Sequence, residues 1–451
     1  MMLLARGEGQ GSQRRWRQGV QLARRSLRRW GLTLLLWSLG PGLVWAQAVP
    51  PELRDPFLSD PEFAEPRDPL LPSLLVPRRL SPLEAYELEG QLDQLAAEAE
   101  AAYQLGENDR AFALWLREVR LRRILGYEAE LAAIQRVGTR AWEANRTLEA
   151  QLLTLRLAEI QADLLDQAPP DLTLVAALAE AFEGLQDIDA AIAVYDTLLT
   201  RATQSGDVAR QVALLERIGD LQARWFRFEA AATTDNRLLN LLGSRPARER
   251  LPYLERAIYS HENAGRLERA IAFQQEILRY YDSQGDLGAR VPLQLAIARN
   301  YRDAERFDLA WVYYQATYRL ALDLDYIGYA RDVLVDLTGL YAVLERPTDV
   351  RYLLEQQLAV ERLAYGGYGM MTVFGQLGQF HEVQGDSAAA IAAYREGLIL
   401  ATYLNHRQAY FQNRIQRLQL AQGEITIEGA TAHITSDAIQ PLENPFRWRG
   451  N

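Results

Sequence analysis

The side chains that most often carry acid–base or metal chemistry are scarce in this chain, which has four histidines and no cysteine. Histidine titrates near neutral pH, and it binds metals together with other histidines, cysteines or carboxylates at short spacing. His406 and His433 have no such companions nearby. Residues 366–369, Gly-Gly-Tyr-Gly, lack the strand–loop–helix context of a phosphate-binding loop and indicate a flexible linker. No serine-nucleophile motif stands out.

These patterns predict no catalytic residue, no metal site and no cofactor, so we expect that the protein is not an enzyme. One alternative stays open, because a carboxylate pair for hydrolysis could be among the 59 acidic residues. The pattern that favours binding is a pair of arginines one helical turn apart, Arg299 and Arg302. Arginines so spaced suit a carboxylate or an extended peptide.

The helices that would position these arginines repeat with a period of about 40 residues. Residues 172–199 are typical: Ala179 and Phe182 lie on one helical face, a turn follows, and Ala191 and Tyr195 lie on the next helix. Each unit is therefore predicted to be a helical hairpin. With Ala191 as the anchor, the equivalent residues are Ala111, Ala150, Ala191, Ala231, Ala270, Ala310, Val350 and Ala390.

Small residues and rings recur at fixed distances from the anchor. A small residue twelve positions before it would let two helices approach closely, and rings nine before or four after it would fill the space between hairpins. The small residues are Ala99, Gly138, Ala179, Gly219, Ala298 and Gly378, with Ile258 and Thr338 as exceptions; the rings are Phe182, Tyr301, Tyr341, Trp115, Tyr195, Tyr314 and Tyr394. Gln222 and Asp235 replace both rings in the Ala231 unit, so its packing is in question.

His261 and His381 occupy the ring position nine before their anchors. We therefore predict that both are packing residues inside the array, and three units between them would keep them from sharing a metal. Glycine followed by Asp or Asn marks turns, as at residues 106–109 and 385–386, because glycine can end one helix and Asp or Asn can begin the next.

This order of small, aromatic, glycine, alanine and aromatic residues resembles the hairpin signature of the tetratricopeptide repeat family. The resemblance covers roughly residues 83–404, about seven tenths of the chain. The period exceeds the family's usual length of about 34 residues, which indicates longer helices or loops. The resemblance implies an all-α protein, a right-handed α-α superhelical solenoid of about eight helical hairpins. It also implies that the first helix of each unit lines the concave face.

By the same resemblance, residues eleven, eight and seven positions before each anchor should point into the groove. The candidate partner-binding residues are Arg224, Tyr259, Glu262, Asn263, Arg299, Arg302, Asp303 and Gln379. Tyr259 beside the arginine pair would suit a protein or peptide segment. The alternative is that these are ordinary solvated side chains, with the arginines paired to Glu262 and Asp303.

The first 48 residues are predicted to be a signal peptide. A basic region with eight arginines precedes an apolar run at residues 32–44, and Ala46-Gln47-Ala48 is typical of a cleavage site. The run is too short for an ordinary membrane span. An uncleaved anchor and, because of two arginine pairs, twin-arginine export stay open. Without this leader, the net charge of −10 becomes about −17, which argues against general nucleic-acid binding.

Three further segments flank the repeats. Residues 49–82 are rich in acidic-residue–proline pairs and are predicted to form an extended arm, whose leucines could pack on the first repeat. Residues 405–422 are predicted to contain a capping helix with an apolar seam through Tyr410, Phe411 and Ile415. Residues 423–451 are predicted to be a flexible tail, with docking through Phe446 and Trp448 as the alternative.

These expectations combine into one hypothesis, an exported scaffold whose concave face binds a protein or peptide segment. It would act in the assembly or maintenance of an envelope or membrane complex, in the periplasm or, if the source is cyanobacterial, in the thylakoid lumen. An extracytoplasmic enzyme or binding protein for a glycan or small ligand, using the same groove, is the rival hypothesis. Self-assembly through the terminal repeats or the tail is a third.

Overall fold

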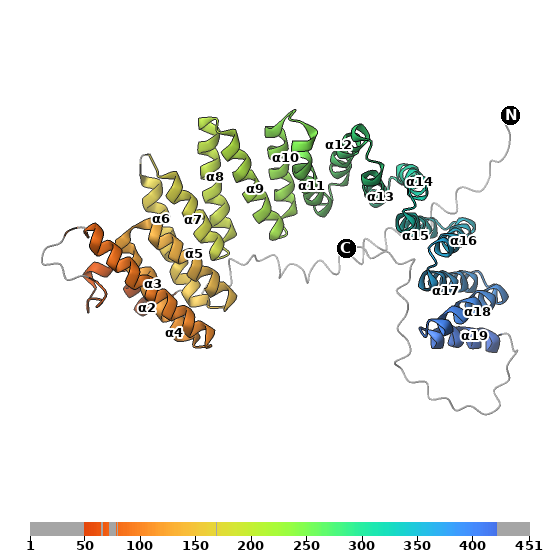
Figure 1. Cartoon of the computed structure of the whole chain (residues 1–451), viewed down its shortest axis with the longest axis horizontal. Coiled ribbons are helices and arrows are strands. Elements are labelled where there is room, and N and C mark those ends of the chain that lie inside the picture. Colours follow the sequence, from red (N-terminus) through yellow and green to blue (C-terminus); the bar gives the residue numbers. More distant parts are fainter. Residues whose placement is uncertain (1–48, 65, 72–77, 79, 168, 422–451) are drawn as a thin grey trace, which may run out of the picture. The chain divides into compact units, whose positions relative to one another are not determined.

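The computed structural model describes residues 49–64, 66–71, 78, 80–167 and 169–421. These residues form two compact all-helical units, which we call unit 1, ending at Asp207, and unit 2, beginning at Val208. Helices that follow one another in the chain pack side by side within each unit, so each is an α-solenoid of antiparallel hairpins (Figure 1). The predicted fold class, an all-α solenoid, is confirmed.

Unit 1 contains three hairpins, preceded by a short helical segment. The hairpins are α3 (Pro82–Gln104) with α4 (Asn108–Arg122), α5 (Tyr127–Glu143) with α6 (Thr147–Asp166), and α7 (Leu172–Gly184) with α8 (Ile188–Ser205). A single turn of 3-10 helix, η3 (Arg123–Leu125), follows α4. The first helix α5 packs closely on the first helix α7.

Unit 2 contains five hairpins and a final helix. The hairpins are α9 (Val208–Arg224) with α10 (Phe228–Leu242), α11 (Ala247–Asn263) with α12 (Leu267–Gln284), α13 (Leu287–Asp303) with α14 (Phe307–Asp323), α15 (Ile327–Val343) with α16 (Pro347–Leu363), and α17 (Gly367–Val383) with α18 (Ser387–Tyr403). Helix α19 (Gln408–Ala421) packs on α18. The two units together give eight hairpins in the described residues, as the period predicts.

The anchor residues explain why the hairpins recur so regularly. In every hairpin the anchor is the fourth residue of the second helix, from Ala111 in α4 to Ala390 in α18. All eight are buried, with at most 3% of their surface exposed. A small side chain at this position lets the second helix approach the first, and stacking of neighbouring hairpins then buries the remaining apolar faces.

The turn inside each hairpin also has one conformation throughout. The residue five positions before the anchor has a positive φ in all eight hairpins, but only three of these residues are glycine: Gly106, Gly265 and Gly385. The other five are Asn145, Gln186, Phe226, Glu305 and Glu345. A left-handed residue at this point ends the first helix and reverses the chain. Glycine therefore marks only some of the turns that the fold requires.

The small residues twelve before the anchor lie where close approach was predicted. A Cβ built at Gly378 would lie 2.3 Å from a ring carbon of Tyr394, the ring four positions after the same anchor. At Gly219 it would lie 3.1 Å from Oδ1 of Asp235, which occupies the same position in the Ala231 unit. The two positions therefore face each other across the hairpin.

The Ala231 unit packs through polar contacts in place of its missing rings. Asp235 is buried and accepts a hydrogen bond of 2.7 Å from Nε of Arg256 in the next hairpin. Thr234 Oγ1 donates to Gln222 Oε1 at 2.8 Å. This pairing satisfies polar groups that burial would otherwise penalise, so the unit keeps its place in the stack.

The extended conformation predicted for residues 49–82 is wrong at its beginning. Residues Pro51–Leu58 form helix α2, and Pro61–Phe63 form a turn of 3-10 helix, η2. Proline is compatible with the first turn of a helix, where no N–H partner is needed, and Pro51 begins α2. Leu71 packs with Leu88, Leu92 and Leu121 of the first hairpin, as the leucines of this segment suggested.

At the other end, α19 covers the last hairpin. Phe411 is buried against Tyr394 and Ala390, with Tyr410 and Ile415 packed beside it. The predicted signal peptide and the predicted tail, residues 1–48 and 423–451, lie outside the described residues. Within the described part, no helix is both long enough and apolar enough to span a bilayer.

Candidate protein-binding face of unit 2

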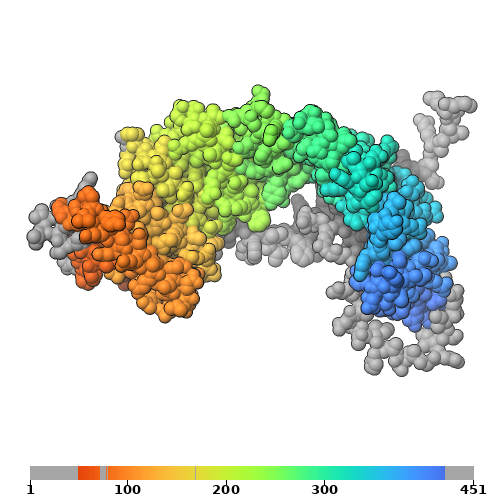
Figure 2. All heavy atoms as spheres, viewed as in Figure 1, coloured from red at the N-terminus to blue at the C-terminus, as the bar shows by residue number. Residues whose placement is uncertain are grey.

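The predicted binding residues come mainly from the first helices of unit 2, namely α9, α11, α13, α15 and α17. Helix α13 packs directly on α15 as well as on α14, so these first helices lie together along one side of the unit. We call this side the first-helix face. Side chains close the space between neighbouring hairpins of unit 2, so the face is a continuous surface (Figure 2).

The position eight before the anchor contributes to the interior of the hairpin. Its side chain contacts the residue four after the anchor, as where Gln274 Nε2 donates to Glu262 Oε1 at 2.9 Å. Arg302 Nη1 lies 3.5 Å from the hydroxyl of Tyr314 in the same relation, and Tyr195 donates to Glu183 at 2.6 Å in unit 1. Glu262 and Arg302 therefore hold helices together before they could meet a partner.

Glu262 is further restrained by the next hairpin. Asn300 Nδ2 donates to Glu262 Oε1 at 2.6 Å and to Gln274 Oε1 at 3.0 Å. Both amide residues are buried, with 7% and 2% of their surfaces exposed. Hydrogen bonds to a carboxylate in such surroundings fix its position, so Glu262 links α11, α12 and α13.

The predicted arginine pair shares a carboxylate from α15. Arg299 Nε donates to Asp336 Oδ2 at 2.7 Å, and Arg302 Nη1 lies 3.3 Å from Asp336 Oδ1. Sequence reasoning paired the arginines with Glu262 and Asp303 and missed Asp336. The signal was available, because Asp336 lies one helical turn before Gly339, a residue assigned to the groove in the adjacent hairpin.

The two arginines differ in their freedom. Arg302 has 15% of its side chain exposed and also donates from Nε to Asp303 at 2.9 Å. Burial lowers the pKa of Arg302, but the hydrogen bond to Asp303 and nearby negative groups outweigh burial and raise it, so the side chain stays charged. Arg299 has 43% of its side chain exposed, and its Nη atoms make no hydrogen bond to any described residue. Arg299 is the member of the pair that can reach a partner.

An exposed aromatic cluster lies on α11 and the preceding turn. Tyr259 is 52% exposed and stacks edge-to-face on Phe228, with ring centroids 5.8 Å apart. Phe228 contacts Phe226 in the same geometry at 5.9 Å, and Phe226 is 80% exposed with a φ of 57°. Sequence reasoning singled out Tyr259 but missed both phenylalanines, because their contact depends on the turn conformation.

The remaining predicted residues are spread over the face. Asn263 is exposed and donates from Nδ2 to the carbonyl oxygen of Tyr259 at 2.8 Å, and Arg224 is the exposed last residue of α9. Gln379 donates to the hydroxyl of Tyr410 at 3.1 Å and so links α17 to α19. The structure thus brings together Tyr259 with Asn263, and Arg299 with Arg302 and Asp303. It places Gln379 four helices away from α13.

The histidine of this unit that was predicted to pack does so. His261 is fully buried, its ring lies 5.5 Å from that of Phe273, and its Nε2 is 3.2 Å from Oδ1 of Asn236. Burial, with a further contribution from Arg266, lowers the pKa of His261. Among the described residues, no group of three histidine, aspartate or glutamate side chains could hold a metal ion.

Comparison with known proteins identifies no family from sequence: no family model and no curated protein matches the chain. Similar solved structures are BtubC from P. vanneervenii, at 16% identity over 54% of this chain and 96% of that chain with a TM-score of 0.33, and the quorum sensor NprR from B. thuringiensis, at 11% over 67% and 83% with a TM-score of 0.31. A signal-transduction ATPase with a tetratricopeptide repeat sensor from Pyrococcus horikoshii is 12% identical over 76% and 52%, with a TM-score of 0.35. At these scores the fold assignment rests on the helices themselves.

Proposed function

We propose that this protein is a non-enzymatic interaction scaffold whose first-helix face in unit 2 binds a protein segment. The observation that carries the proposal is the exposed ring cluster of Phe226, Phe228 and Tyr259, with Arg299 in the corresponding position of the next hairpin. Aromatic and arginine side chains supply most of the binding energy in protein interfaces. Large rings left in water by the protein's own packing are therefore candidate contacts for a partner.

The chemistry of the face indicates the kind of segment. Tyr259 and Arg299 both lie eleven positions before their anchors, so a segment crossing the first helices would meet the rings and then the guanidinium. The rings favour an apolar or aromatic side chain. The terminal nitrogens of Arg299 favour a carboxylate, which an arginine binds with two parallel hydrogen bonds. The segment we propose carries an apolar residue followed by an acidic one.

Export remains part of the proposal. The basic and apolar leader in residues 1–48 supports delivery to the periplasm or, in a cyanobacterium, to the thylakoid lumen, where the scaffold would serve an envelope or membrane complex. A fusion of these 48 residues to a reporter that is active only outside the cytoplasm tests this directly. An inactive, cytoplasmic fusion would contradict export.

Photo-crosslinking tests the proposed face. A photoreactive amino acid in place of Tyr259 should give a crosslinked partner that mass spectrometry identifies, whereas the same amino acid in place of Tyr352 should not. Tyr352 is a matched control because it is 59% exposed and lies on the second helix α16. The identified partner is then purified and its affinity measured by titration calorimetry.

Single substitutions locate the contact. Tyr259→Ala should weaken binding about 30-fold, which corresponds to the roughly 2 kcal/mol of an aromatic hot spot. Arg299→Gln should also weaken binding while leaving Arg302 paired with Asp336, and Arg351→Gln on α16 is its exposed control. Charge reversal at Arg302 is not a clean test, because a glutamate there would face Asp303 and Asp336. Wild-type affinity in both Tyr259→Ala and Arg299→Gln would refute this face as the binding site.

A further inference from the structure

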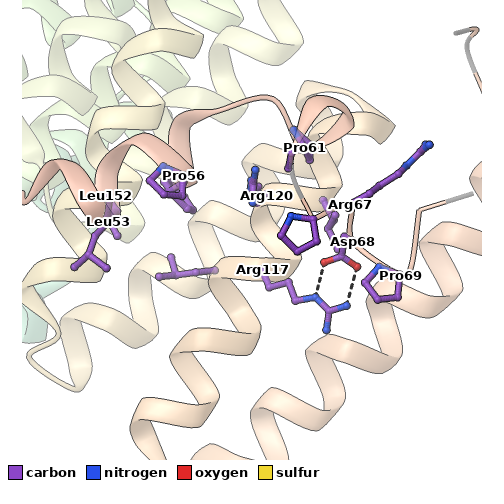
Figure 3. A pocket seen from close by; sticks show the side chains of 14 residues that line it. Leu53, Pro56, Pro61, Arg67, Asp68, Pro69, Arg117, Arg120 and Leu152 are labelled. Carbon is purple, nitrogen blue, oxygen red and sulfur yellow. Dashed lines mark hydrogen bonds and ion pairs between the residues drawn. The ribbon is translucent and has the colours of Figure 1, made fainter.

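The N-terminal segment of the described chain lies against unit 1 in the manner of a bound peptide. Residues 49–71, which we call the arm, contain α2 and η2; α2 contacts α4 and α6, and η2 contacts η3. The arm carries six acidic residues and two arginines, so it is acidic, and five prolines follow or precede its acidic positions. Figure 3 shows the arm passing over α4 with Asp68 facing Arg117.

The surface beneath the arm presents three arginines from α4 and η3. Arg117 binds Asp68 with two parallel hydrogen bonds of 2.7 Å, through Nε and Nη2. Arg120 Nη2 donates to Ser59 Oγ at 2.9 Å, and Arg123 Nη1 donates to the carbonyl oxygen of Leu58 at 3.1 Å. The arm is therefore held by charge complementarity and by hydrogen bonds from guanidinium groups.

One aromatic side chain of the arm is also bound. Phe57 is buried, and the guanidinium carbon of Arg123 lies 5.1 Å from the centroid of its ring. A cation over an aromatic face at this distance is attractive, more so where water is excluded. The bound pattern is thus an aromatic residue followed by an acidic, proline-rich stretch.

The arm nevertheless leaves this surface incompletely satisfied. Arg120 Nε and Arg123 Nη2 are buried and have no hydrogen-bond partner among the described residues, and the Arg123 side chain is only 7% exposed. Burial lowers the pKa of Arg123 to about 10, although Glu130 opposes this effect. A buried donor without an acceptor is a substantial penalty, so this site has unused capacity for an acceptor.

Two cavities between the arm and the repeats have the same meaning. One, of about 560 Å³, is lined by Pro56, Pro61 and Asp68 from the arm and by Arg117, Arg120 and Leu152 from α4 and α6 (Figure 3). The other, of about 430 Å³, includes Arg123 and Arg156 in its walls. Well-packed protein interiors leave few voids larger than a water molecule, so the arm does not fill the surface it covers.

We propose that α4, η3 and α6 form a second binding site, for an acidic, proline-containing segment of another protein with an aromatic residue, and that the arm is its resident, displaceable occupant. The segment of a partner is favoured over the arm of a second copy, because a second arm would leave the same two donors unpaired and the same cavities empty. A partner with an additional carboxylate near the position of Ser59 would reach Arg120 and Arg123. This site is separate from the face proposed in unit 2.

Competition between a synthetic peptide and the arm tests the proposal in the full-length protein. The probe is a fluorescent peptide of residues 49–71, measured by anisotropy. The tethered arm competes at a high effective concentration, so wild-type protein should bind the peptide weakly. Asp68→Asn in the protein removes the carboxylate that faces Arg117 and should strengthen peptide binding at least fivefold. The matched control is Asp109→Asn, which removes a similar 2.7 Å pair with Arg146 elsewhere in unit 1 and should change nothing.

Two further measurements decide between explanations. A peptide with Ser59→Glu should bind the Asp68→Asn protein at least tenfold more tightly than the unchanged peptide, and one with Ser59→Gln should not, because only the carboxylate matches the two unpaired donors. Adding Arg117→Gln to the protein should reverse the gain from Asp68→Asn. Equal peptide affinity in wild type and Asp68→Asn, or no effect of Ser59→Glu, would overturn the site. A concentration-dependent dimer of the Asp68→Asn protein in light scattering would overturn the partner assignment in favour of exchange between copies.

Discussion

Substitution of Gly378 by alanine should destabilise the last hairpin, although the same change favours an isolated helix. The added Cβ would lie 2.3, 2.5 and 2.6 Å from three ring atoms of Tyr394. Tyr394 is fully buried, with its ring 6.2 Å from that of Phe411 and 6.3 Å from that of Tyr410, so it cannot move without displacing α19. Overpacking a core costs about 1–3 kcal/mol, and three such contacts point to the upper end.

The helical gain from replacing glycine by alanine, about 0.5–1 kcal/mol, offsets part of this penalty. We therefore expect a net loss of about 2 kcal/mol, which corresponds to roughly 30-fold faster opening of α17 and α18. Gly339→Ala is the matched control, because Gly339 is also inside a first helix and a Cβ there meets nothing within 4 Å. It should slow opening of α15 by roughly two- to fivefold, since only the helical gain remains.

Hydrogen exchange followed by mass spectrometry is the suitable assay, because a repeat array opens locally and a single melting temperature would average over its hairpins. Exchange is compared helix by helix in the two variants and the wild type. Opposite signs at the two glycines are the expected result. Unchanged or stronger protection of α17 and α18 in Gly378→Ala would refute the conclusion that Gly378 is required for close approach to Tyr394.

Three other predictions concern stability. The lowered pKa of His261 means that the unfolded chain takes up a proton as pH falls below the ordinary value of 6.5 while the folded chain does not, so stability should fall from there down to the lowered pKa; it should be independent of His261 above 6.5, and His261→Phe should remove this dependence in pH-resolved denaturation. Asp235→Ala should cost about 3 kcal/mol in denaturant titrations, because it leaves Arg256 without its buried partner, whereas Asp235→Leu combined with Arg256→Met should recover much of the loss; equal losses in both would contradict this. Tyr365→Gly should stabilise by about 0.5–1 kcal/mol, since Tyr365 has a φ of 52° and is 93% exposed, and a destabilised variant would show that this turn is not strained.

The sequence indicated the hairpins because their signal is repeated eight times. Each anchor from Ala111 to Ala390 marks the same depth in the same helix, and a period of about 40 residues is hard to produce by any other architecture. It could not indicate every turn, because the left-handed residue that glycine provides at Gly265 is supplied by Phe226 and Glu345 elsewhere. Packing of the surrounding helices imposes this conformation on residues that do not prefer it.

The candidate site could be predicted only in part. Spacing placed Tyr259 and Arg299 on the same helical face, because helical geometry fixes which residues lie above one another. Which of these side chains stay available depends on neighbours from other hairpins, such as Asp336 and Asn300. A periodic pattern carries no information about such pairs, since they join residues about 40 positions apart.

The sequence by itself thus determined the helical repeat, the position of each hairpin and the packing role of His261, all of which follow from local periodicity. Tertiary structure alone decided that Arg302 and Glu262 are internal links, that Phe226 and Phe228 complete an aromatic cluster with Tyr259, and that the arm folds into α2 on the arginines of α4 and η3. The physical reason is the same in each case. Periodicity fixes which face of a helix is apolar, whereas ion pairs and ring contacts depend on which side chains from distant segments meet across that face.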